Sequence, residues 1–145
     1  MMRLSWRRRD ESSDSIGRPA FFAQHRCYHS TVELTFIQPT SFASEWRRYG
    51  LTDEDLQALE IEIMRRPESG AVMIGTGGLR KMRFAPPSWN RGKSGGLRVC
   101  YVVFVEAAQC YLLSMFQKNE MANLSDADKR EWRQWIEAKR KELKT

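Results

Sequence analysis

Six cationic side chains lie in a stretch of the sequence that contains no acidic residue. No Asp or Glu occurs in residues 69–105, whereas acids and bases are interspersed elsewhere. The cations of this stretch are Arg80, Lys81, Arg83, Arg91, Lys93 and Arg98. A segregated positive surface suits a polyanion, and nucleic acid is the commonest polyanion. A solvated basic loop without a ligand is the alternative interpretation.

The spacing of these cations predicts that they converge on one site. Residues 79–84 alternate as a strand does, so Lys81 and Arg83 share a face at a separation of about 7 Å. Arg98 begins the next predicted strand, and Lys118 follows the third. Such a cluster can hold a phosphate and stabilise the charge that develops in phosphoryl transfer, without a metal ion or a histidine. Four snorkelling surface side chains are the plainer alternative.

Two glycine clusters accompany the cations, at residues 75–78 and 92–96. Glycine lets a backbone come close to a ligand, which favours the binding interpretation. Neither cluster is a P-loop, because the second lacks the earlier glycine of that motif and no helix pattern follows it. The sequence therefore argues against a nucleoside triphosphatase.

The composition limits the kinds of catalytic site that the chain can contain. Half of the net charge of +6 comes from the short segment 1–32, which has six arginines and three acids, and residues 33–145 carry 18 cations and 15 anions. Both histidines lie in that first segment, so we expect neither a Ser-His-Asp site nor a zinc site in the rest of the chain. No segment reaches the roughly 20 apolar residues of a membrane span. Three cysteines without ligand spacing fit a reducing cytoplasm, and we expect no metal and no cofactor.

The expected elements suggest one domain preceded by an extension. Residues 1–31 lack periodicity and are interpreted as a poorly ordered basic extension, and residues 32–145 as the domain. Thr40 or Ser41 is expected to cap the first helix, and Thr52 and Asp55 to form a capping box on the second. The predicted elements are a strand at 32–37, helices at 42–49 and 53–66, strands at 79–84, 97–105 and 109–116, and a helix from Ser125 to about residue 143. The order β-α-α-β-β-β-α predicts an α+β fold.

Three sequence motifs resemble the HigB-like branch of the RelE toxins, the toxins of bacterial type II toxin–antitoxin modules. They are GTGGLRKMR at residues 75–83, GKSGGLRV at residues 92–99, and Lys118-Asn119-Glu120 followed by Leu124 and Ser125. The resemblance covers residues 32–143 and leaves out the N-terminal extension. It implies a RelE-like fold with two N-terminal helices packed on a small curved antiparallel sheet and a C-terminal helix.

The same resemblance implies a metal-independent endoribonuclease that cuts mRNA in the ribosomal A site. The RNA 2′-hydroxyl would attack its own 3′-phosphate. Arg83 and Arg98 would then stabilise charge, Lys81 would be the candidate general base, and Lys118 would protonate the leaving oxygen. The expected RNA contacts are Arg80, Lys93, Asn119 and Glu120, of which Glu120 is also a second candidate base.

Partners and competing functions follow from the resemblance too. It implies a cognate antitoxin, expected to carry a helix-turn-helix domain, together with the 70S ribosome and its mRNA, and no membrane. Better-known RelE members have an arginine where this chain has Asn119, and a tyrosine near the C-terminus that this chain lacks. Two alternatives stay open: a ParE-like toxin that poisons DNA gyrase without cutting RNA, and an inactive relative that only binds its antitoxin.

Overall fold

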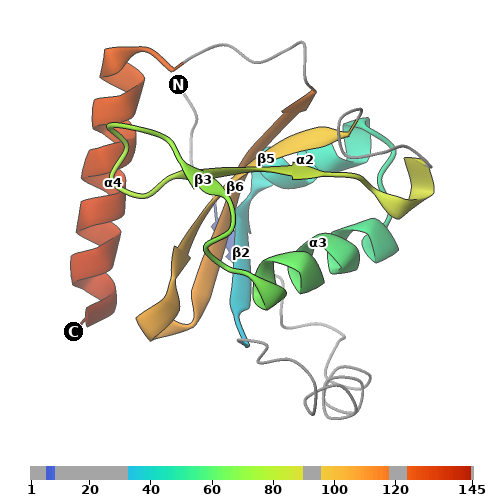
Figure 1. Cartoon of the computed structure of the whole chain (residues 1–145), viewed down its shortest axis with the longest axis horizontal. Helices are drawn as coiled ribbons and strands as arrows, with labels where there is room; N and C mark the ends of the chain where they lie inside the picture. The colour runs from blue at the N-terminus through green and yellow to red at the C-terminus, as the bar shows by residue number, and fades with distance from the viewer. Residues whose placement is uncertain (1–5, 9–32, 90–95, 118–123, 145) are drawn as a thin grey trace.

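The computed structural model describes residues 6–8, 33–89, 96–117 and 124–144. Within these ranges a mixed sheet is flanked by helices on both faces (Figure 1). The elements are β1 Trp6–Arg8, β2 Thr35–Pro39, α2 Thr40–Arg48, α3 Asp53–Arg65, β3 Ala71–Val72, β4 Arg80–Phe84, the 3₁₀ turn η1 Pro87–Trp89, β5 Leu97–Phe104, the 3₁₀ turn η3 Val105–Ala107, β6 Gln109–Gln117 and α4 Asp126–Lys144. The expected α+β class and the order of the main elements are confirmed.

The sheet has six strands in the order β1-β2-β6-β5-β4-β3. β5 pairs antiparallel with both β4 and β6, as predicted. β2 pairs parallel with β6, so the expectation of a wholly antiparallel sheet was wrong. Hydrophobic alternation identifies a strand and its buried face, but the same alternation is read in either direction, so it carries no information on the direction of a distant partner.

Two strands were not expected from the sequence. β1 pairs antiparallel with β2 and comes from the segment interpreted as a poorly ordered extension. β3 pairs with β4 and has only two residues, too few to show a period. The rest of residues 1–31 lies outside the part of the chain that the structure describes.

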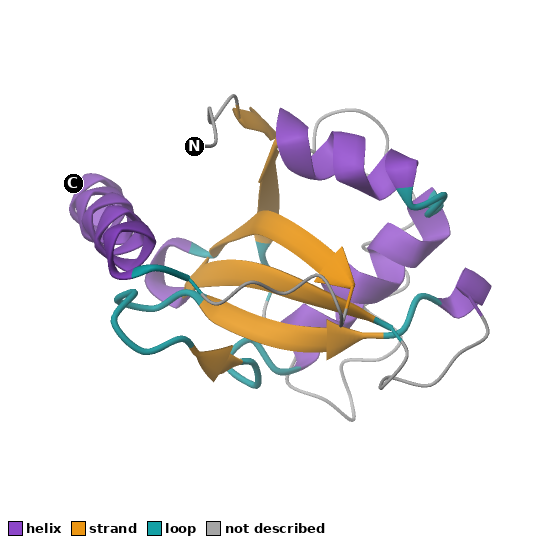
Figure 2. Ribbon diagram, turned by 90° about the horizontal axis from the view of Figure 1, so that it is seen from above, coloured by secondary structure: helices purple, strands orange, loops and turns teal. Residues whose placement is uncertain are grey.

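The helices form two layers around the sheet. α2 and α3 cover one face and α4 lies on the other, as Figure 2 shows from above. The first face buries Phe36, Phe42 and Trp46 with apolar residues of α3, β4, β5 and β6. The opposite face buries a smaller cluster centred on Ile136 of α4 and including Val102, Phe104, Tyr111 and Leu113. The sheet is thus apolar on both sides, which suits a central layer.

The cap predicted for α3 is confirmed, and the cap predicted for α2 is wrong. Thr52 and Asp55 form the reciprocal capping box of α3, and Ser125 and Asp128 bond reciprocally at the start of α4. The N-cap of α2 is Pro39, with no side-chain cap bond, so neither Thr40 nor Ser41 has the predicted role. β2 ends at Pro39 and α2 begins at Thr40, so the strand passes into the helix without an intervening turn.

Candidate phosphate-binding face

Strand register places two arginines directly opposite each other. Arg83 of β4 pairs with Arg98 of β5, and Arg98 pairs in turn with Phe116 of β6. Paired residues in antiparallel strands project from the same face, so these three side chains form one row across the sheet, here called the arginine row. The row lies on the α4 side, because Met82, Phe84 and Val99 face the core under α2 and α3.

Arg98 is buried, and its guanidinium group does not make all of its possible hydrogen bonds. Its side chain is among the few buried charged groups, at 9% exposure. Its Nη1 atom has no hydrogen-bond partner. A buried guanidinium without full hydrogen bonding costs several kcal/mol relative to a solvated one, at about 1–3 kcal/mol for each lost partner.

The positive charge of Arg83 next to Arg98 also destabilises the protein when no anion is bound. Arg83 is its direct cross-strand neighbour, and like charges in opposed positions destabilise a sheet. Within the described ranges, neither arginine forms an ion pair with a carboxylate. A bound phosphate would satisfy Nη1 and neutralise both cations, because arginine forks match phosphate oxygens.

A second row lies beside the first. It contains Lys81 of β4, Cys100 of β5 and Ser114 of β6, which are paired across the three strands. Burial raises the pKa of the Cys100 thiol, and the smaller opposing effects of a hydrogen bond with Ser114 and of the Lys81 charge do not reverse the shift. Cys100 is therefore a neutral thiol at physiological pH and is unsuited to act as a nucleophile. Lys81 is placed next to the arginine row, as the sequence predicted.

Arg80 does not belong to this face. Strand alternation directs it away from Lys81 and Arg83. Its Nη1 donates to the backbone oxygens of Glu68, at 2.9 Å, and Gly70, at 2.7 Å. Those bonds tie the turn after α3 to β4, so we assign Arg80 a structural position and leave it out of the site.

The first glycine cluster packs against α4 rather than lining the arginine row. Arg133 donates from Nε and Nη2 to the carbonyl oxygen of Gly75, at 3.2 and 3.0 Å. A Cβ built on Gly77, where φ is +79°, would lie 3.3 Å from Cγ of Arg133. The close backbone approach that these glycines permit is therefore used by the C-terminal helix. The expected contact of this cluster with a polyanion has no support in this geometry.

The second glycine cluster is described only at its last residue. A Cβ on Gly96 would come within 2.2 Å of the carbonyl oxygen of Phe84, so only glycine fits beside β4 at this point. The segment leading toward this cluster is held at η1, where Ser88 donates to Asp55 from its hydroxyl at 2.6 Å and from its amide at 3.0 Å. Asp55 thus joins the start of α3 to the chain that approaches β5.

Four of the predicted site residues cannot be placed. Lys93, Lys118, Asn119 and Glu120 lie outside the described residues. The structure brings together Lys81, Arg83 and Arg98. It also adds Phe116 and Ser114, which the sequence interpretation missed. Extending the alternation of residues 109–116 to the neighbouring strand would have found Phe116, but only once the register with β5 was known.

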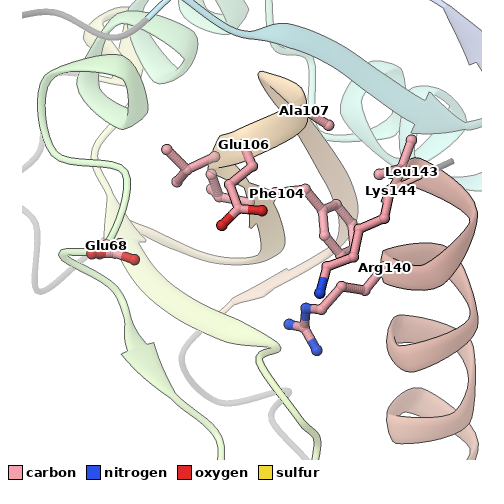
Figure 3. Close-up of a pocket in the computed structure, with 9 residues that line it drawn as sticks. Glu68, Phe104, Glu106, Ala107, Arg140, Leu143 and Lys144 are labelled. Carbon is pink, nitrogen blue, oxygen red and sulfur yellow. The ribbon is translucent and has the colours of Figure 1, made fainter.

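A separate pocket lies near the C-terminal end of α4. Figure 3 shows Arg140 and Lys144 on one side of this cavity and Glu106 on the other, with Phe104 between them. The cavity has a volume of about 450 Å³. It lies at the end of β5 opposite Arg98, about 20 Å along the strand. Its walls carry both signs of charge, so it lacks the uniformly positive lining of the arginine row.

Comparison with known protein families does not assign this chain. A scan against models of protein families finds no match. Among the residues that the structure describes, no helix has both the length and the apolar character needed to cross a membrane.

Proposed function

We propose that this chain is the toxin of a bacterial type II toxin–antitoxin module and acts as a ribosome-dependent mRNA endoribonuclease. The observation that carries the proposal is the buried Arg98, whose Nη1 has no partner and whose direct neighbour is Arg83. Local rules of sheet stability are violated there, and such violations occur mainly at functional sites. The motif resemblance to HigB-like toxins supplies the reaction class and the ribosome.

The chemistry needs few groups from the protein. A phosphodiester held in the arginine row presents its phosphorus to the adjacent 2′-hydroxyl. That oxygen loses its proton to a base and bonds to phosphorus, and the bond from phosphorus to the 5′-oxygen breaks. The 5′-oxygen takes up a proton, which leaves a 2′,3′-cyclic phosphate and a 5′-hydroxyl. Arg83 and Arg98 stabilise the extra negative charge of the phosphorane-like transition state.

The proton carriers are assigned with the help of the resemblance. Lys81 lies on the same face as the arginine row, two residues before Arg83, and is the candidate base. Lys118 is the candidate acid for the 5′-oxygen, and Glu120 is the alternative base. The antitoxin would inhibit by covering this positive face, since an acidic or backbone-rich segment can satisfy the same arginines.

The first experiment is primer extension on mRNA from bacteria after a brief induction of the chain without its antitoxin. We expect cuts inside translated codons, and we expect them to disappear when translation of the message is blocked. Intact mRNA together with a DNA-damage response would favour a gyrase poison instead. Intact mRNA with normal growth would indicate an inactive relative.

A substitution at Arg98 tests the site itself. We expect Arg98→Ala to lower the cleavage rate at least about 100-fold, the usual effect of removing one preorganised charge-stabilising group. The same change removes a buried, partly unsatisfied cation, so we expect the free energy of unfolding to stay equal or rise. Arg98→Lys keeps the charge but loses the fork and should have intermediate activity.

The matched control is Arg65→Ala, which removes an exposed arginine from the last turn of α3. Cleavage by this variant should equal that of the wild-type chain. Full cleavage by Arg98→Ala, with circular dichroism showing an intact fold, would eliminate the arginine row as the active site.

A further inference from the structure

Phe116 of β6 is the third member of the arginine row. It is the cross-strand partner of Arg98 and therefore projects from the same face of the sheet. Its ring is half-buried and packs against the apolar cluster under α4, which includes Cys100 and Leu113. The row thus ends in an aromatic side chain that is held by packing on one side and remains partly accessible.

The spacing of the row matches the size of a nucleotide. Neighbouring strands are about 4.8 Å apart, so the backbone of Phe116 lies about 5 Å from that of Arg98 and about 10 Å from that of Arg83. This sequence of groups, two guanidinium side chains and then an aromatic ring, follows the order of phosphate and base within one nucleotide. A ring fixed by packing loses little conformational freedom when a base stacks on it.

We propose that Phe116 is the stacking platform for the nucleobase attached to the phosphate that Arg83 and Arg98 bind. The inference rests on the proposed function in one respect, namely that the ligand of the arginine row is RNA. It goes further by defining the substrate as an unpaired nucleotide, because a base inside a duplex cannot stack on the ring. Stacking tolerates any sequence, since every base has a π-face, and the larger purine face favours purines over pyrimidines.

The test compares binding of two labelled single-stranded RNA pentamers at low salt by fluorescence anisotropy, one complete and one with a single abasic nucleotide at its centre. The wild-type chain should bind the complete RNA about tenfold more tightly. Phe116→Leu keeps the apolar packing but removes the aromatic face. It should bind the complete RNA about tenfold more weakly than wild type, and the abasic RNA equally well.

Two further variants separate stacking from the phosphate contact. Phe116→Trp should retain the preference for the complete RNA, because it keeps an aromatic surface. Arg98→Ala should weaken both RNAs by the same factor, since both carry the phosphate. A blunt RNA duplex of the same sequence should compete poorly with the single strand.

The proposal is overturned if Phe116→Leu weakens both RNAs equally, if it weakens neither, or if the wild-type chain binds neither. The outcomes for the two proposals remain distinct. Base-dependent binding without mRNA cleavage in cells would contradict the nuclease and keep the stacking platform. Cleavage that requires Arg98 but is insensitive to Phe116→Leu would keep the nuclease and remove the platform.

Discussion

Arg83 and Arg98 occupy opposed positions on adjacent antiparallel strands, although either could be replaced by an apolar residue with less electrostatic cost. The alternation of residues 79–84 was sufficient to predict that Lys81 and Arg83 share a face. The burial of Arg98 could not be predicted, because it depends on the register between β4 and β5 and on what covers the sheet. The burial of Arg98 is therefore a property that only the assembled sheet has.

Asp55 is expected to make the free energy of unfolding depend on pH. Burial raises the pKa of Asp55, but hydrogen bonds from Ser88 and Thr52 outweigh it, and the net pKa lies below the usual value of 3.8. A carboxyl whose pKa is lower in the folded state stabilises the fold above the unfolded-state pKa of about 3.9. That contribution is lost as the pH falls through about 4 toward the lower folded-state pKa.

Urea denaturation between pH 7 and pH 2 measures this effect. Asp55→Asn should lose about 1–2 kcal/mol of unfolding free energy at pH 7 and show a flatter dependence below pH 5. Glu54→Gln is the control, because Glu54 is exposed in the same helical turn and takes no part in the bonds of Asp55 with Thr52 and Ser88. Equal acid slopes in Asp55→Asn and in the wild-type chain would contradict the assigned bonds.

Among the elements, those with local signals were predicted well. α3 was identified by its capping box and by Pro67, and β5 by its β-branched and aromatic run. The parallel pairing of β2 with β6 and the irregular register at Cys100 and Tyr101 were not predictable. The β2–β6 pairing joins segments some 70 residues apart, and a short sequence window contains no information on such a contact. The register shift lies between the neighbouring strands β5 and β6, and the apolar alternation of either strand alone does not show it.

The turn between β5 and β6 contains a residue with a strained backbone. Ala108 has a φ of 55°, in the left-handed region, where a residue with a Cβ is disfavoured by about 1–2 kcal/mol. Glycine removes that cost, but it also makes the unfolded chain more flexible. That flexibility offsets about 0.5–1 kcal/mol of the gain in stability. We expect Ala108→Gly to raise the free energy of unfolding by about 0.5–1 kcal/mol, measured by urea denaturation.

Ala107→Gly is the matched control one residue earlier. Ala107 belongs to η3 and has no positive φ, so glycine there should be destabilising by about 0.5–1 kcal/mol. Opposite signs for these adjacent substitutions are the expected outcome. A loss of stability in both variants would show that the left-handed conformation at Ala108 is not the source of strain.

On the α4 side of the sheet, the two ends of β5 have different surroundings. At one end of β5 the apolar cluster binds α4, and Arg140 of that helix lies over the ring of Phe104, with its Cζ 5.8 Å from the centroid. At the other end the arginine row begins. The carbonyl oxygens of the turn containing Gly75 and Gly77 accept from α4 arginines, which fixes the helix relative to the sheet. α4 is thereby anchored away from Arg83 and Arg98.

The N-terminal extension provides the last prediction, because it contributes the strand β1 that pairs with β2. Among the residues from 33 onward that the structure describes, both apolar clusters are already extensive. Deleting residues 1–31 removes β1 and its antiparallel pairing with β2, an edge of three residues. At about 1 kcal/mol for each hydrogen bond, we expect the deletion to lower the unfolding free energy by about 1–3 kcal/mol and to preserve cooperative unfolding and mRNA cleavage.

Arg7→Pro in the full chain is the control, since proline in β1 removes a donor while all other residues remain. Similar losses in the two proteins would show that pairing along β2 is the whole contribution, whereas an insoluble deletion product would mean that the extension belongs to the domain.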